Sequence, residues 1–289
     1  SLVVSILSFR RLKEILPRVS DHYNRPAFVR DDPVSVPRAY MPGGEAGLRW
    51  GIPYHPVNAE VAGLLAAHFA WGRRDIILSK TWEALSRIHY HPVAFLRELK
   101  RSGSLPSPFA GFVHRTYNGQ DLDWMFAQWS AAWDRHATLE VLFSGGTCSE
   151  ALHCYAGWMR EELPRGDRMR KHFASPVQGS ACKRMLMFLR WMIRKDEAGV
   201  DLGIWNNLPA GRLELPLDVH AAATAKALGL LPVRQTLNWK AVEALGKKAK
   251  QIFPGDPALL DYALFGLGEE AKRTRLSVGE LLMRWSDRP

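Results

Sequence analysis

Apolar residues recur at helical spacing along most of this chain, and runs that alternate in the manner of a strand are scarce. β-Branched residues, which favour strands, are also sparse. A first helix is expected in the N-terminal stretch SLVVSILSFRRLKEIL. Further helices are expected at 57–72, 74–88, 91–101, 119–134, 147–162, 180–195, 216–228, 237–253 and 256–267. The pattern predicts an all-α fold for the 289 residues.

Residues 25–57 interrupt this pattern with six prolines and four glycines. Proline removes a backbone donor and clashes with the preceding turn, so we expect no helix in this segment. A structureless stretch of this length is often functional, but a connector laid over the surface explains it equally well.

The clearest helix ends are expected at 256–267. Asp256 is suited to cap a helix whose first residue is Pro257. Gly266 and Gly268 are expected to end that helix.

The composition, with 47% apolar and 24% charged residues, excludes a disordered chain. The cysteines are too few for a disulfide framework or for a four-cysteine iron–sulfur or zinc site, which favours a reducing, cytoplasmic compartment. No apolar run reaches the roughly 20 residues that span a bilayer. The histidines show no spacing typical of a metal site, so we expect neither a metal nor a cofactor.

The net charge of +10 favours an anionic partner such as nucleic acid, a membrane surface or an acidic substrate. Residues 163–200 hold nine Lys or Arg against three acids, a local excess of six. More than half of the excess charge therefore lies in 38 of the 289 residues.

Within this basic stretch, a helix is expected to start near Ser180. At 100° per residue, Lys183, Arg190 and Arg194 share one face, opposite an apolar face of Met185, Phe188 and Met192. A turn that exposes backbone N–H groups at a helix start can hold a phosphate. This predicts a phosphate-docking site formed by Gln178, Gly179, Ser180, Arg184 and Arg190. A solvated basic face is the alternative.

Asp218 lies at the expected start of the helix at 216–228. Helix capping alone would account for it. His220, two residues later, is suited to orient that carboxylate or to contact a phosphate. A partly buried histidine with satisfied hydrogen bonds is the alternative.

The order of PVQGSACK and LPLDVHAAATAKALGLL resembles the helix-hairpin-helix DNA glycosylase superfamily, and so do EVAGLLAAHFAWGRRDIILSKTWEAL and DYALFGLG. The long separation of Lys183 from Asp218, without cluster cysteines, is most similar to the archaeal 8-oxoguanine glycosylase branch. The whole chain also resembles uncharacterised bacterial proteins that share YNRPAFVRDDPVSVP, FVHRTYNG and ACKRMLMFLRWM.

The glycosylase resemblance implies one two-lobed helical domain over 1–289, with the hairpin at 163–200 and no iron–sulfur cluster. It implies that Lys183 is the nucleophile and Asp218 its partner carboxylate. Attack requires the neutral amine, which the helix N-terminus, Arg184 and partial burial would favour. The base pocket would contain Trp71, Asp261 and Phe265, although a core position explains Trp71 equally well.

The function expected on this resemblance is removal of an oxidised purine from damaged double-stranded DNA, with strand nicking by lyase chemistry. We expect a monomer, located in the cytoplasm and with the nucleoid when bound to DNA. Two alternatives stay open: a non-catalytic nucleic-acid-binding protein in which Lys183 only contacts phosphate, and a small-molecule enzyme with a Schiff-base lysine.

Overall fold

The computed structural model describes residues 7–103 and 105–287, with only the backbone of residues 134 and 135. These residues form thirteen α-helices, several 3₁₀ turns and one two-residue antiparallel strand pair, so the all-α prediction is confirmed. The helices are α1 (Phe9–Tyr23), α2 (Ser35–Arg38), α3 (Glu45–Trp50), α4 (Pro56–Phe69), α5 (Arg74–Ser86), α6 (Pro92–Ser102), α7 (Gly119–His136), α8 (Cys148–Glu161), α9 (Lys183–Ile193), α10 (Val219–Ala227), α11 (Trp239–Ile252), α12 (Leu259–Thr274) and α13 (Val278–Ser286). The strands are β1 (Val113–His114) and β2 (Tyr117–Asn118), and the 3₁₀ turns are η1 (Pro26–Val29), η2 (Glu140–Phe143), η3 (Arg168–His172), η4 (Pro176–Gln178) and η5 (Ala210–Arg212).

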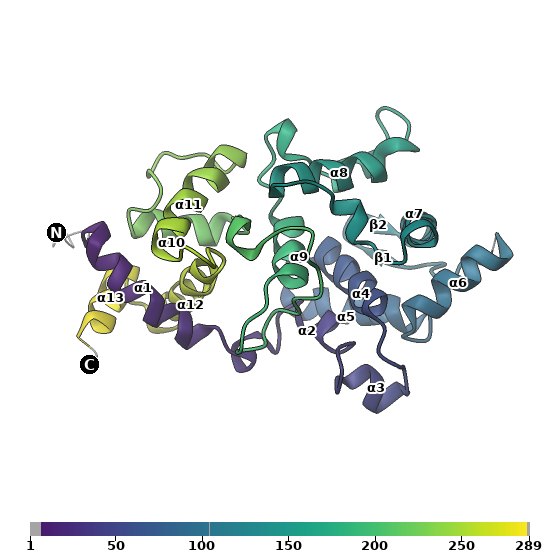
Figure 1. Cartoon of the computed structure of the whole chain (residues 1–289), viewed down its shortest axis with the longest axis horizontal. Coiled ribbons are helices and arrows are strands. Elements are labelled where there is room, and N and C mark those ends of the chain that lie inside the picture. Colours follow the sequence, from purple (N-terminus) through teal and green to yellow (C-terminus); the bar gives the residue numbers. More distant parts are fainter. Residues whose placement is uncertain (1–6, 104, 288–289) are drawn as a thin grey trace.

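The two ends of the chain come together in space. Helix α1 packs along α12 and also touches α11 and α13. Figure 1 shows these helices, with α10, on one side of the molecule and α2 to α8 on the other. Helix α9 lies between the two groups, where it packs against α4 and α8. Helix α9 begins at Lys183, which this central position places between the two groups.

Helix α4 is the most buried element. Thirteen of its fourteen residues are buried, and it packs against α2, α5, α6 and α9. Burial on all sides explains why its sequence is apolar all round rather than striped.

The prediction that 25–57 holds no helix is wrong. The segment contains η1, α2 and α3. Pro26 stands in the first turn of η1, where its missing N–H costs nothing. Gly51 ends α3 in the left-handed conformation, with φ 65°. Pro26 and Gly51 therefore mark ends of short helices, and the prolines and glycines of this segment do not exclude helix.

The predicted ends of the helix at 256–267 are also wrong. The helix begins at Leu259, because the Asp256 carboxylate binds Arg194 instead of capping. The two glycines lie inside the helix, which continues to Thr274. A Cβ on Gly266 would lie 2.1 Å from the Tyr23 ring, so this glycine allows α1 and α12 to pack closely.

The predicted exposed cationic face of α9 is wrong for two of its three residues. Arg190 and Arg194 are buried, with 7% and 1% of their surface exposed. Arg190 pairs with Asp201 and Asp261, and Arg194 with Asp196, Asp201 and Asp256. Helical periodicity placed the three side chains on one face correctly but did not show that carboxylates cover that face.

The first six residues of the expected N-terminal helix lie outside the described residues. The rest of that helix, α1, runs on past its predicted end at residue 16 to Tyr23. Within the described residues, no helix combines the length and apolar character needed to cross a membrane.

Candidate functional site

A cleft of about 980 Å³ lies between the two groups of helices. Its walls come from the segment 29–33, the α4–α5 loop, η3, α9, α10 and α12. It brings together eight residues singled out from the sequence: Trp71, Lys183, Arg184, Arg190, Asp218, His220, Asp261 and Phe265. Gln178, Gly179 and Ser180 do not line it.

Lys183 is the first residue of α9. The preceding residue, Cys182, adopts the left-handed conformation with φ 48°, so the helix begins three residues later than predicted. The chain thereby turns sharply just before the helix, and the lysine side chain, 33% exposed, reaches into the cleft.

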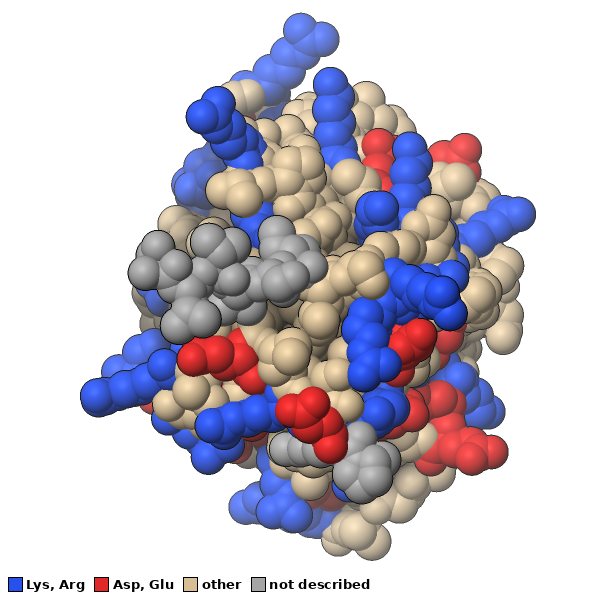
Figure 2. All heavy atoms as spheres, turned by 90° about the vertical axis from the view of Figure 1, so that its left-hand side faces the viewer, with Lys and Arg blue, Asp and Glu red and all other residues tan. Residues whose placement is uncertain are grey.

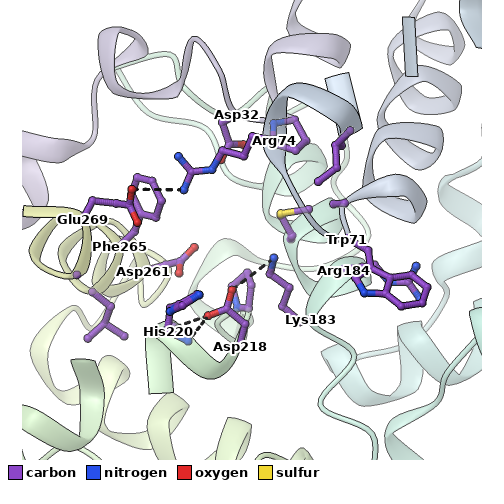
Figure 3. A pocket seen from close by; sticks show the side chains of 18 of the residues that line it. Asp32, Trp71, Arg74, Lys183, Arg184, Asp218, His220, Asp261, Phe265 and Glu269 are labelled. Atoms are coloured by element: carbon purple, nitrogen blue, oxygen red, sulfur yellow. Dashed lines mark hydrogen bonds and ion pairs between the residues drawn. The ribbon is translucent and has the colours of Figure 1, made fainter. Parts of the chain in front are cut away.

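Asp218 faces Lys183 across the cleft (Figure 3). Its Oδ2 lies 3.6 Å from the lysine Nζ. Its Oδ1 accepts hydrogen bonds from the backbone N–H groups of His220 and Ala221, at 2.9 and 2.8 Å. The same carboxylate therefore caps α10 and pairs with the lysine. Helix capping by Asp218 does not prevent it from being the partner of Lys183.

The electrostatic surroundings keep Asp218 ionised. Burial on its own would raise the pKa of this carboxyl. The N–H of Ala221 and the positive charge of Lys183 outweigh that effect, and the pKa is lowered overall. Asp218 therefore presents a negative charge beside the amine at neutral pH.

A second carboxyl, Asp261, enters the cleft from the first turn of α12 (Figure 3). Its side chain is 13% exposed and pairs with Arg190. Burial raises its pKa to about 6, with the Arg190 charge opposing and the Asp218 charge adding to the shift. Asp218 and Asp261, two of the carboxyls that line the cleft, thus differ in basicity.

Arg190 does not fit the phosphate-contact role expected for it. Its guanidinium is held by Asp201 and Asp261, and its side chain is 8% exposed. Neutralisation by two carboxylates removes the charge that would attract a phosphate. Its role in the cleft is to position Asp261.

Phe265 lies one turn after Asp261 on α12, and its ring is already partly covered. The guanidinium of Arg74 lies 4.9 Å from the ring centre. Arg74 also comes within 3.9 Å of Glu269, and so connects α5 to α12 across the cleft (Figure 3). Arg74 was not predicted as a site residue, although two adjacent arginines directly after Trp71–Gly72 indicate a basic loop beside the predicted pocket.

Trp71 stands apart from the other two predicted base-pocket residues. Figure 3 shows it on the opposite side of Lys183 from Asp261 and Phe265. It is 46% exposed, and the Arg115 guanidinium lies 5.8 Å from its ring. Trp71 is therefore not a core residue, and the three side chains do not form one wall.

Arg184 is anchored by a buried polar cluster that was not predicted from the sequence. Its Nη1 donates to the backbone carbonyl of His68, 2.7 Å away. The His68 ring is fully buried between the hydroxyls of Tyr117 and Tyr155, at 3.1 and 2.7 Å. These partners are 49 and 87 positions away along the chain, beyond the reach of any local pattern.

Three of the remaining predicted phosphate contacts lie at or near the turn η4, and the fourth, His220, lies on α10. Gln178 and Gly179 are exposed, and Gly179 has φ 82°. The Ser180 hydroxyl accepts from the backbone N–H of Cys182 at 3.2 Å, and so helps to form the turn before α9. His220 is exposed at the start of α10 and lines the cleft. Among the described residues, no three His, Cys, Asp or Glu side chains gather closely enough to hold a metal.

Comparison with known families corrects the resemblance inferred from the short motifs. A family model described as "Protein of unknown function (DUF2400)" matches residues 53–270. The chain belongs to the DUF2400 family. No helix-hairpin-helix glycosylase family matches, so the assignment to that superfamily, including the archaeal 8-oxoguanine branch, is wrong. Searches for similar curated proteins and solved structures find no match.

The match to DUF2400 spans α4 to α12 up to residue 270, and so includes every residue singled out in the cleft from the sequence. The family description names no activity. The geometry of the cleft is therefore the basis for a proposed function.

Proposed function

We propose that the protein is a DNA glycosylase with lyase activity that removes an oxidised purine, such as 8-oxoguanine, through a Schiff base on Lys183. The observation that carries the proposal is the placement of the Lys183 amine 3.6 Å from the Asp218 carboxylate inside a cleft of about 980 Å³. That volume is at the upper end of ordinary ligand pockets and leaves room for a flipped nucleotide.

The proposed reaction uses the two residues in turn. Once Asp218 has accepted a proton from the lysine, the amine attacks C1′ of the nucleotide. The bond from C1′ to the base breaks as the N–C1′ bond forms, and the base leaves with the bonding electrons and takes up a proton. Loss of the second amine proton and opening of the sugar ring give the imine, from which β-elimination cleaves the strand.

Charge in and around the cleft supports a nucleic-acid substrate. Seven Lys and Arg side chains line the cleft against four carboxylates, an excess of three positive charges: Arg73, Arg74, Lys171, Lys183, Arg184, Arg190 and Lys272 against Asp32, Asp218, Asp261 and Glu269. Positive charge held in a concave site attracts a polyanion and fixes its backbone. In this proposal the two groups of helices act as two lobes, and η4 with α9 acts as the hairpin that holds a phosphate. The protein would then be found with DNA in the cell.

The test is a panel of oligonucleotides carrying different base lesions, assayed for base release and for covalent trapping with borohydride. We expect wild type to release one lesion and to be trapped on it, and Lys183→Gln to do neither. Lys240→Gln, which removes an exposed lysine outside the cleft, is the matched control and should behave as wild type. Full activity of Lys183→Gln would exclude the mechanism.

Asp218→Asn separates catalysis from the alternative of a non-catalytic nucleic-acid-binding protein. Asparagine caps a helix nearly as well as aspartate, so α10 should stay folded. If Asp218 takes the lysine proton, base release should fall by about 10²- to 10⁴-fold while DNA affinity changes little. A pure binding protein would show no activity in either form, and the loss of a negative charge would leave its affinity unchanged or raise it.

A further inference from the structure

A second hollow, of about 430 Å³, lies against α8 and shares no lining residue with the cleft. It is lined by His153, Ala156, Gly157, Arg160, Glu161, Leu163, Arg165 and Arg170. Three arginines thus gather on a surface to which the sequence analysis assigned no role.

Backbone carbonyls hold two of these arginines in place. Arg160 donates through Nε and Nη2 to the carbonyl of Arg170, at 3.3 and 3.2 Å. Arg170 donates through Nη1 to the carbonyls of Arg160 and Leu163, at 2.9 and 2.6 Å. The reciprocal bonds fix both guanidinium groups at the C-terminal end of α8.

The positive charge of this cluster is not neutralised within the described part of the chain. No Asp or Glu oxygen there lies within ion-pair distance of Arg160, Arg165 or Arg170, and Nε and Nη2 of Arg170 find no acceptor. Burial, followed by the nearby charge of Arg170, lowers the pKa of Arg160. Glu161 supplies one carboxylate to the same lining, so the three arginines leave the hollow with a net positive charge. A net positive charge in a hollow indicates a site for an anion that the chain itself does not supply.

The hollow is joined to the turn before α9. Arg160 donates through Nη1 to the Gln178 side chain at 2.9 Å. The carbonyl of Gly179 accepts from the backbone N–H of Trp239 at 3.0 Å, which ties that turn to the start of α11. Hydrogen bonds therefore connect the arginine cluster to the turn before α9, and that turn to α11.

We propose that Arg160, Arg165 and Arg170 form a phosphate site for the nucleic-acid strand whose nucleotide occupies the cleft. The inference rests on the proposed function, because it takes the strand at Lys183 as its starting point. Guanidinium groups suit a phosphodiester, whose oxygens accept two parallel hydrogen bonds from one arginine. The free donors of Arg170 and the exposed Arg165 would make these bonds, while Arg160 holds the turn.

The first test measures DNA affinity as a function of salt for Arg165→Gln and for the double variant Arg165→Gln/Arg170→Gln. Each lost phosphate contact should weaken binding alike on all sequences and reduce the slope of log K against log salt by about 0.9. Arg97→Gln on α6, an exposed arginine distant in the fold, is the control and should leave the slope unchanged. Arg165 is exposed and forms no hydrogen bond or ion pair with the other described residues, so its variant keeps the test valid even if the double variant fails to fold.

The second test places one uncharged methylphosphonate linkage at successive positions of the strand. One position should weaken binding by wild type and have no effect on the Arg165→Gln/Arg170→Gln variant. The site is excluded if no substituted position affects binding by the two proteins differently. It is also excluded if the double variant binds inorganic phosphate more weakly but binds DNA as wild type does. If one position weakens binding by wild type only, but borohydride traps no protein on DNA, the phosphate site is supported and the glycosylase proposal is excluded.

Discussion

At the residue scale, two of the carboxyls that line the cleft differ because their surroundings differ. Asp218 receives two backbone N–H bonds and faces Lys183, so its negative charge is stabilised. Asp261 is more deeply buried, and desolvation outweighs the attraction of Arg190. The sequence shows two aspartates, and only their surroundings show which of them holds its proton more tightly.

The stability of the protein should depend on pH through Asp261. Its pKa in the folded chain is about 6, above its ordinary 3.8, so folding favours the protonated form. This contribution is fully present below about pH 4 and is lost as the pH rises through 6. Asparagine resembles the protonated carboxyl, so wild type should lose up to about 3 kcal/mol relative to Asp261→Asn between pH 4 and pH 7. Urea unfolding of both proteins over this pH range measures the loss. A difference in stability between them that does not change with pH would contradict the prediction.

At the element scale, the ends and packing of helices depend on partners outside each helix. Gly266 resembles a helix end in the sequence but lies in the middle of α12. The neighbouring helix α1 requires the absence of a side chain there, because Tyr23 fills the space. Tertiary packing therefore overrides the usual tendency of glycine to end a helix.

Two glycine-to-alanine changes should have opposite effects. Gly266→Ala should destabilise the fold by about 1–3 kcal/mol, since the added methyl overlaps the Tyr23 ring. Gly157→Ala in α8 meets no atom within 4 Å and should stabilise it by up to about 1 kcal/mol, the difference in helix propensity. Thermal unfolding of both variants measures these effects. If the two variants change the unfolding temperature equally, the packing of α1 on α12 does not require a glycine at position 266.

At the scale of the whole molecule, a buried charge network joins segments distant in the sequence. Arg194 at the end of α9 binds Asp256 just before α12, and Asp196 and Asp201 in the following loop. Asp196 in turn accepts a hydrogen bond from Asn24, just after α1. The network connects α9 to the segments next to α1 and α12.

Arg194→Met should therefore cost about 3–5 kcal/mol, because buried carboxylates lose their cation. The loss should shrink at low pH, where those carboxyls bind protons. Arg273→Met is the control: its pair with Glu270 is 4.0 Å long with the arginine 76% exposed, and its loss should cost at most about 1 kcal/mol. Denaturant unfolding at two pH values tests both. A cost for Arg194→Met as small as for the control would show that the network contributes little.

The excess positive charge is not confined to the cleft. The face at the left of Figure 1, seen directly in Figure 2, carries Lys and Arg side chains around its outline with acidic side chains among them. Two of the arginines counted in the basic stretch are buried and paired. Local net charge in the sequence therefore does not show which of the cations are exposed to a partner.

The sequence by itself determined the helical class and the approximate extent of most helices, since helical periodicity is a local property. It also placed Lys183 and Asp218 near expected helix starts, because local patterns show such positions without a structure. Asp261 was singled out only through the glycosylase resemblance, which is wrong.

Only the tertiary structure decided which of these residues meet. It brought Lys183 and Asp218 together, gave Arg190 to Asp261 rather than to solvent, and gathered Arg160, Arg165 and Arg170 into one hollow. The physical reason is that burial and ion pairing depend on segments far apart in the chain, and desolvation sets the charge of each group only after those segments have packed.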